Sequence, residues 1–262
     1  MVIKMQMPLS FAADERLPEI LDRLSLAWPQ RDQQHADPLS QLIFMLVSAD
    51  TPSAIALAAH QRMRLRYLRW SDLRDVAPEV LLQVLHGVER AVEKAVTLPR
   101  VLQAIEDRHG LLELDFLAGW STTAAREWLE ELPGVDATVS AATLNFSSLR
   151  RTILTMNART AQAARRLALV EKGAPMSALD RQVMNRVPAD WQAKEVASLY
   201  NGLRKLTETY CHQGKPDCKR CPLNDLCPTA SAKSAQVISF PHEKHNRERP
   251  SEQTVPQQSL SH

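Results

Sequence analysis

All four cysteines of this 262-residue chain lie in one short stretch, CHQGKPDCKRCPLNDLC, as Cys211, Cys218, Cys221 and Cys227. Six, two and five residues separate successive cysteines. In a chain kept in a reducing compartment, clustered thiols bind metal more often than they form disulfides. The stretch therefore predicts a metal centre near the C-terminus, which the preceding chain must fold around.

The spacing bears on which metal centre the cysteines hold. Zinc sites generally pair two Cys-x2-Cys turns, and here only Cys218 and Cys221 form such a turn. A compact loop with four thiolates can instead surround a [4Fe–4S] cluster, in which each iron takes one cysteine. Ligand type and spacing favour the iron–sulfur cluster, with zinc as the alternative and an empty thiol cluster as a third reading.

Composition favours an all-α fold with one large core or two moderate ones. The chain has only 7 glycines and 5% aromatic residues, whereas sheets favour aromatic and β-branched residues and turns that contain glycine. No apolar run is long enough to span a bilayer. The first residues, MVIKMQMPLSFAADER, do not resemble a signal peptide. We therefore expect a cytoplasmic protein.

Hydrophobic periodicity predicts a series of helices. Residues 16–27 carry apolar side chains at helical spacing, and DPLSQLIFMLVSAD begins at Asp37 and Pro38 as a central buried helix would. Later helical segments end at Gly87, Gly110 and Gly134. A last amphipathic helix, WQAKEVASLYNGLRKLTETY, leads into the cysteines, and the polar segment after them is expected to be disordered.

Basic residues are concentrated although the formal net charge is only +2. Residues 137–170 contain no acidic residue, and a second basic cluster, RMRLRYLRW, covers residues 62–70. Such stripes are typical of a phosphate-binding face, but also of a solvated helix surface. The arginines of the first stripe are Arg150, Arg151, Arg159, Arg165 and Arg166.

The cysteine spacing, after a mostly helical body, resembles the iron–sulfur loop of endonuclease III and its relatives, the helix-hairpin-helix (HhH-GPD) DNA glycosylases. EWLEELPGVDATVSAATL resembles their hairpin, whose LPGVG turn lets backbone N–H groups reach a DNA phosphate. The resemblance extends over about residues 16–228, and LLQVLHGVERAVEKA matches a segment carrying a wedge side chain. It implies these DNA-binding residues: Leu132, Pro133, Gly134, Val135, Asp136, Val88, Arg159, Lys215, Lys219 and Arg220.

The same resemblance implies two helical domains with a DNA-binding cleft between them. One would be a helical-barrel domain over residues 39–151, with the helix-hairpin-helix at about 121–145. The other would be an iron–sulfur cluster domain formed by residues 16–38 and 152–228. Residues 1–15 would be a flexible N-terminus and residues 229–262 a disordered tail.

Two catalytic positions of the family are substituted. Thr138 stands four residues after Gly134, where bifunctional members have a lysine that forms a Schiff base, and a hydroxyl cannot form that imine. The family's catalytic aspartate aligns with Asn157, 23 residues after Gly134. Asp180 is the rival match, but choosing it leaves no segment to match the helix before the last one.

These substitutions leave three hypotheses. The first is a DNA-binding protein for repair or lesion recognition, without lyase chemistry and with glycosylase chemistry lost or altered. The second is an active monofunctional glycosylase of base excision repair that uses Asp50, Asp136 or Asp180 as its carboxylate. The third is an iron–sulfur redox sensor. For the first two, the expected partner is double-stranded DNA, damaged or distorted, bound by a monomer at the bacterial nucleoid.

Overall fold

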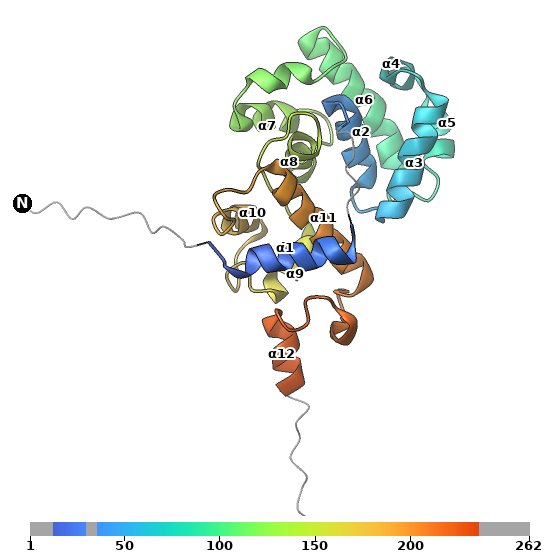
Figure 1. Cartoon of the computed structure of the whole chain (residues 1–262). Coiled ribbons are helices and arrows are strands. Elements are labelled where there is room, and N and C mark those ends of the chain that lie inside the picture. The colour runs from blue at the N-terminus through green and yellow to red at the C-terminus, as the bar shows by residue number, and fades with distance from the viewer. Residues whose placement is uncertain (1–12, 30–35, 236–262) are drawn as a thin grey trace, which may run out of the picture.

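The computed structural model describes residues 13–29 and 36–235 of the chain. Within these two ranges the chain forms twelve α-helices, two short 3₁₀ helices and no strand. The predicted all-α fold class is therefore confirmed. Figure 1 shows two groups of helices, and the first helix lies with the group formed mainly by the C-terminal half of the chain.

The first group surrounds a core whose buried residues run from Leu39 to Leu144. Its elements are α2 (Pro38–Ser48), α3 (Ser53–Arg66), α4 (Trp70–Arg74), α5 (Pro78–Val84), α6 (Ala91–His109), η1 (Asp115–Gly119), α7 (Thr122–Glu130) and α8 (Ala137–Phe146).

The second group surrounds a core built from residues 17–24 and 154–223. Its elements are α1 (Arg16–Ala27), α9 (Ala158–Arg166), α10 (Met176–Met184), α11 (Ala193–Thr209), η2 (Cys218–Arg220) and α12 (Pro228–Ala235). The side chain of Phe146, at the end of α8, packs against both cores. The exact domain boundaries stay a prediction.

Helix α2 is the centre of the first group. Asp37 caps it by accepting a hydrogen bond from the Ser40 amide at 2.8 Å, and Pro38 occupies its first turn, as the sequence predicted. Ten of its eleven residues are buried, and it packs against α3, α6 and α8. A helix that is apolar on nearly all sides can exist only inside such a group.

Helix α11 is the centre of the second group, where it packs against α1 and α9. Its approach to α1 is close because Gly202 has no side chain. A Cβ at Gly202 would lie 2.8 Å from the Cβ of Leu24, which is closer than real Cβ contacts allow. This contact joins the N-terminal helix to the helix that leads into the cysteines.

Two stretches that the sequence placed in flexible or disordered segments make defined contacts in the described chain. Asp14, within the expected flexible N-terminus, donates its amide to the Arg186 carbonyl at 2.9 Å. Residues 228–235, in the expected disordered tail, form α12. Ala230 is buried there, and its amide donates to the Cys227 carbonyl at 3.0 Å. Residues 1–12 and 236–262 lie outside the described part of the chain.

None of the helices in the described ranges has both the length and the apolar character that a membrane-spanning helix requires.

We predict that Gly202→Ala lowers the free energy of unfolding by about 1–2 kcal/mol, because overpacking against Leu24 outweighs the roughly 1 kcal/mol that alanine adds to helix propensity. Chemical denaturation followed by circular dichroism measures the change. Gly214→Ala is the matched control, because a Cβ there would meet nothing within 4 Å. Equal stabilities of the two variants would contradict the close α1–α11 contact.

Candidate functional site

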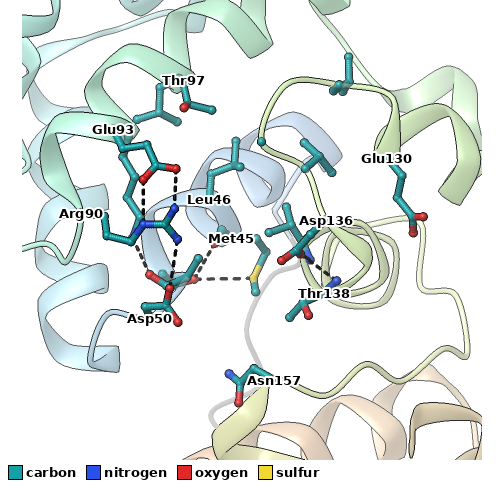
Figure 2. A pocket seen from close by; sticks show the side chains of 18 of the residues that line it. Met45, Leu46, Asp50, Arg90, Glu93, Thr97, Glu130, Asp136, Thr138 and Asn157 are labelled. Atoms are coloured by element: carbon teal, nitrogen blue, oxygen red, sulfur yellow. Dashed lines mark hydrogen bonds and ion pairs between the residues drawn. The ribbon is translucent and has the colours of Figure 1, made fainter. Parts of the chain in front are cut away.

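A pocket of about 450 Å³ opens where the two groups of helices meet. Its lining residues come from the end of α2, from α6, from the turn between α7 and α8, from the first turn of α8, from the start of α9 and from α11. The volume lies within the range of about 300–1,000 Å³ typical of small-molecule sites. Figure 2 shows Asp50 and Arg90 on one side, and Asp136, Thr138 and Asn157 on another.

The pocket collects many of the residues that sequence reasoning selected. Asp180 does not line it, since this residue lies on α10 and its carboxylate accepts from the Arg181 amide at 2.8 Å. Arg159 follows Asn157 on α9 but points outside the pocket lining, where it is exposed. The selected residues that line the pocket are Asp50, Leu132, Gly134, Val135, Asp136, Thr138 and Asn157.

The hairpin turn is built on Gly134. Its φ of 74° lies in the left-handed region, and a Cβ there would lie 2.6 Å from Cγ2 of Thr97 on α6. Both restrictions exclude other residues without a shift of the backbone. Leu132 and Val135 are buried on either side of the glycine, while Pro133 is exposed. The turn is thereby fixed against α6 at the edge of the pocket.

Asp136 caps the second helix of the hairpin. One carboxylate oxygen, Oδ1, accepts hydrogen bonds from the amides of Thr138 at 2.9 Å and Val139 at 2.8 Å. These amides at the start of α8 are of the kind that would bind an anion, and here the protein's own carboxylate occupies them. The sequence analysis selected Asp136 as a DNA-binding residue and as a possible replacement acid. The structure makes it an N-cap that also lines the pocket.

Asn157 caps α9 at the pocket. Its side-chain Oδ1 accepts hydrogen bonds from the backbone amides of Arg159 at 3.1 Å and Thr160 at 3.0 Å. The backbone amide of Asn157 in turn donates to the Thr160 hydroxyl at 3.1 Å. Because the oxygen serves the cap, the side-chain Nδ2 is the group left for a ligand. At neutral pH this group is a neutral donor, whereas an aspartate would present a charged acceptor.

Thr138 stands half-buried on the first turn of α8. Among the described residues that line the pocket, the one lysine is Lys94, on α6. A threonine hydroxyl is a weak nucleophile unless a neighbouring base activates it. The position where a Schiff-base lysine would stand thus carries no amine.

Lys94 and Arg204 hold the turn that follows α2. The Lys94 ammonium donates to the carbonyls of Val47 at 2.9 Å and Ala49 at 2.5 Å, and to the Thr51 hydroxyl at 3.1 Å. Arg204, on α11, donates to the Thr51 carbonyl at 2.8 Å. Burial lowers the pKa of Lys94 to about 8, but three acceptors favour its protonated form. At neutral pH, the Lys94 side chain is therefore a protonated ammonium that donates to backbone carbonyls.

Sequence reasoning missed Lys94 and Arg204. A signal for Lys94 exists in the sequence, because it shares the apolar stripe of α6 with Ala95, Leu98 and Val101, all of which are buried. A charged residue on a core-facing stripe indicates a buried partner. No comparable signal identifies Arg204, whose acceptors lie more than 150 positions earlier in the sequence.

The pocket rim carries a small ion-pair network. Arg90 lies 3.5 Å from the carboxylate of Asp50 and 2.6 Å from that of Glu93. Asp50 and Arg90 both have positive φ, 60° and 56°, which places their side chains at the tips of two facing turns. More than half of each side chain is exposed, so solvent screens both pairs and they add little to stability.

Val88, predicted as a wedge side chain, is 6% exposed and packs in the first core. In this arrangement Val88 itself cannot enter a base stack, because its side chain is buried. The glycine before it ends the preceding turn and directs Val88 inward. The neighbours Glu89 and Arg90 are exposed instead.

The arginine stripe is also not a free basic face. Arg151 donates to the carbonyls of Ala118 at 2.7 Å and Trp120 at 2.9 Å, after η1. Arg165 donates to the Ala174 carbonyl at 2.9 Å. In the second cluster, Arg62 donates to two carbonyls after α5, and Arg64 lies over the Trp70 ring. These side chains already bind backbone carbonyls or an aromatic ring, so they are not free to bind phosphate.

The four cysteines line one small cavity beside α9, α11 and α12. Burial and the three neighbouring thiols raise the pKa of Cys221 to about 11. In the described chain, no three His, Cys, Asp or Glu side chains form a group that could hold a metal ion. A zinc ion needs all its thiolates within about 2.3 Å of one point, whereas a four-iron cluster places each thiolate on a different iron. The four thiols thus face one cavity, and the kind of metal centre they hold stays a prediction from their spacing in the sequence.

Arg166 links α9 to the cysteine loop. Its guanidinium donates to Cys211 Sγ at 3.2 Å and to the His212 carbonyl at 2.8 Å, and Cys227 Sγ donates to the Arg166 carbonyl at 3.3 Å. Asn157 begins the same helix. One short helix thus joins the cysteine loop to the pocket.

The basic residues of the cysteine loop are at the surface. Lys215, Lys219 and Arg220 are all exposed. Arg220 lies 3.6 Å from Asp217 and 6.0 Å from the Tyr210 ring centre. These three cations are at the surface, where they can meet solvent or a ligand, whereas most arginines of the stripe donate to backbone carbonyls.

Comparison with solved structures identifies the fold. Endonuclease III trapped as a covalent intermediate with DNA matches with a TM-score of 0.67 and 18% identity, over 86% of this chain and all of that chain. A thermostable thymine-DNA glycosylase matches with a TM-score of 0.64 and 16% identity, over 82% of this chain and 95% of that one.

A 3-methyladenine DNA glycosylase of H. pylori, bound to 1,N6-ethenoadenine, matches with a TM-score of 0.55 and 11% identity, over 73% of this chain and 96% of that one. No family model and no curated protein matches the sequence. The chain thus has the fold of the helix-hairpin-helix glycosylases, as the sequence resemblance implied.

Proposed function

We propose that this protein binds double-stranded DNA at damaged or distorted sites and receives an extruded nucleotide in the pocket between its two cores. Lyase chemistry is absent, and glycosylase chemistry is lost or altered. The proposed loss or change of glycosylase chemistry rests on one observation. Asn157, an uncharged amide, caps α9 at the pocket where the resemblance places a catalytic carboxylate.

Three features support DNA as the partner. Solved structures of the same fold include complexes of endonuclease III with DNA and of a yeast 3-methyladenine glycosylase with abasic DNA. The pocket has room for a nucleotide, which an enzyme or reader of bases must take out of the stack. The exposed cations Lys215, Lys219 and Arg220 can meet the phosphate backbone. One chain contains the whole pocket, so we propose a monomer.

The groups around the pocket support weak or absent hydrolysis. An amide neither stabilises a cationic sugar as an ion pair nor accepts a proton from water at neutral pH. Loss of one such electrostatic group costs about 3–4 kcal/mol of barrier. Asp136 uses one oxygen in a cap, and Asp50 is paired with Arg90. These two acids keep an active monofunctional glycosylase as the alternative.

We also propose that Cys211, Cys218, Cys221 and Cys227 hold a [4Fe–4S] cluster, since all four line one cavity and their sequence spacing suits four thiolates that each bind a different iron. The cluster would cross-link α11, η2 and α12. Its role would be structural, holding the basic loop and the end of α9 in place.

The purified protein should bind duplexes containing uracil, an oxidised pyrimidine, a mismatch, an alkylated base or an abasic site at low salt. Subsequent alkali treatment should reveal no strand break at any intact base, and borohydride should trap no covalent adduct. Asn157→Asp preserves the cap and should raise cleavage of a bound substrate by about a hundredfold or more, since it restores the missing charge. Cleavage by the unaltered protein would establish the alternative function instead.

Iron and acid-labile sulfide should be present in equal amounts in a brown protein. Cys218→Ser should reduce the iron content strongly and lower thermal stability, because structural metal centres contribute directly to folding. Lys215→Ala, in the same loop, is the control and should retain both. A colourless protein that contains zinc would contradict the proposed cluster.

A further inference from the structure

Tyr200 is a buried tyrosine whose hydroxyl has no protein partner in the described chain. The residue lies on α11, is 4% exposed, and packs its ring against Phe146 with ring centroids 5.5 Å apart. No hydrogen bond joins its hydroxyl to another described residue. A hydroxyl that no protein group bonds can donate to water or to a ligand where it reaches solvent.

The Tyr200 hydroxyl opens into the pocket. Four side-chain atoms in the described chain are inaccessible and without a partner: His60 Nε2, Tyr67 Oη, Asn145 Oδ1 and Arg151 Nε. The Tyr200 hydroxyl is not one of them, so it remains accessible, and the residue lines the pocket. Burial raises its pKa. It is therefore a protonated phenol that can donate to a ligand at neutral pH.

The surroundings indicate what kind of ligand atom this hydroxyl would meet. Asn157 offers its Nδ2 to the same pocket, because its oxygen is fixed in the α9 cap. The cations of the pocket floor, Lys94 and Arg204, already donate to backbone carbonyls. Among the charged groups that act on the ionisation of Tyr200, Arg204 comes before Asp136 and Glu208, and Arg204 already donates to the Thr51 carbonyl. The two neutral donors, the Tyr200 hydroxyl and Asn157 Nδ2, suit a neutral acceptor oxygen.

We propose that Tyr200 and Asn157 act as hydrogen-bond donors to neutral oxygen atoms of the extruded nucleotide, and that Tyr200 determines how tightly a given nucleotide is retained. This inference rests on the proposed function. The acceptor oxygen can belong to a base carbonyl or to the deoxyribose. Both sources present the same chemistry to the pocket, and the choice of DNA separates them.

Tyr200→Phe removes only the hydroxyl, and Tyr67→Phe is the matched control, because it removes a buried, unpartnered hydroxyl away from the pocket. Neither should lower thermal stability.

Fluorescence anisotropy at low salt compares binding to four duplexes: uninterrupted, with a tetrahydrofuran abasic analogue, with a mismatched thymine, and with difluorotoluene, which has the shape of thymine without its carbonyls. Asn157→Ser keeps a capping side chain but removes the amide donor.

Tyr200→Phe should weaken binding to a duplex with an extrudable nucleotide about 3- to 10-fold, the value of one hydrogen bond. Binding to the uninterrupted duplex should be unchanged, and Tyr67→Phe should match the unaltered protein throughout. A loss on the tetrahydrofuran duplex assigns the contact to the sugar. A loss on thymine but not on difluorotoluene assigns it to a base carbonyl. Asn157→Ser should show the same selectivity as Tyr200→Phe.

Three results would overturn the inference, and they are distinguishable from one another. If Tyr200→Phe binds every duplex as the unaltered protein does, Tyr200 makes no contact, although DNA binding stands. If the unaltered protein binds no duplex at low salt, the proposed function fails and the inference fails with it. A uniform loss on all four duplexes would also overturn the inference, because it would reflect a general change in the protein.

Discussion

The carboxyl end of α2 is the point where the two halves of the molecule are joined. Its last carbonyls carry the negative end of the helix dipole. Lys94, from the first group of helices, donates to them, while Arg204, from the second group, donates to the Thr51 carbonyl in the next turn. Nearby, the Ser53 hydroxyl donates to Glu208 of α11 at 2.7 Å. Charged groups from both halves thus fix one turn. The position of this turn shapes the pocket beside it.

Two helix N-termini also face this pocket, and both are closed by side chains of their own. Asp136 occupies the first amides of α8, and Asn157 occupies those of α9. An open helix N-terminus attracts anions, but these are satisfied internally. Beside the charged groups of the pocket, these two termini present the Nδ2 side of the Asn157 amide and the Thr138 hydroxyl, and Tyr200 lies in the same lining. Such a lining suits recognition of neutral oxygen and nitrogen atoms better than it suits bond cleavage through a charged intermediate.

The sequence predicted features that depend on local spacing. The cap at Asp37, the turn at Gly134 and the all-helical class follow from short patterns, and the structure contains each of them. It did not predict features that depend on which carbonyl lies opposite a side chain. Arg151 looked like part of a phosphate-binding stripe, yet it holds the carbonyls after η1. The resemblance placed Val88 among the DNA-binding residues, yet its side chain packs in the first core. Periodicity identifies the buried face of a helix, but not the distant groups that this face meets.

Extrusion of a nucleotide into the pocket is measured most directly with 2-aminopurine placed opposite a mismatched base in a duplex. Its fluorescence is quenched by stacking and increases when the base leaves the helix. Saturating amounts of the protein should increase the fluorescence, because a pocket of about 450 Å³ between the two cores accepts the displaced base. Tight binding with no change in fluorescence would show that the duplex stays stacked, and would contradict the role assigned to the pocket.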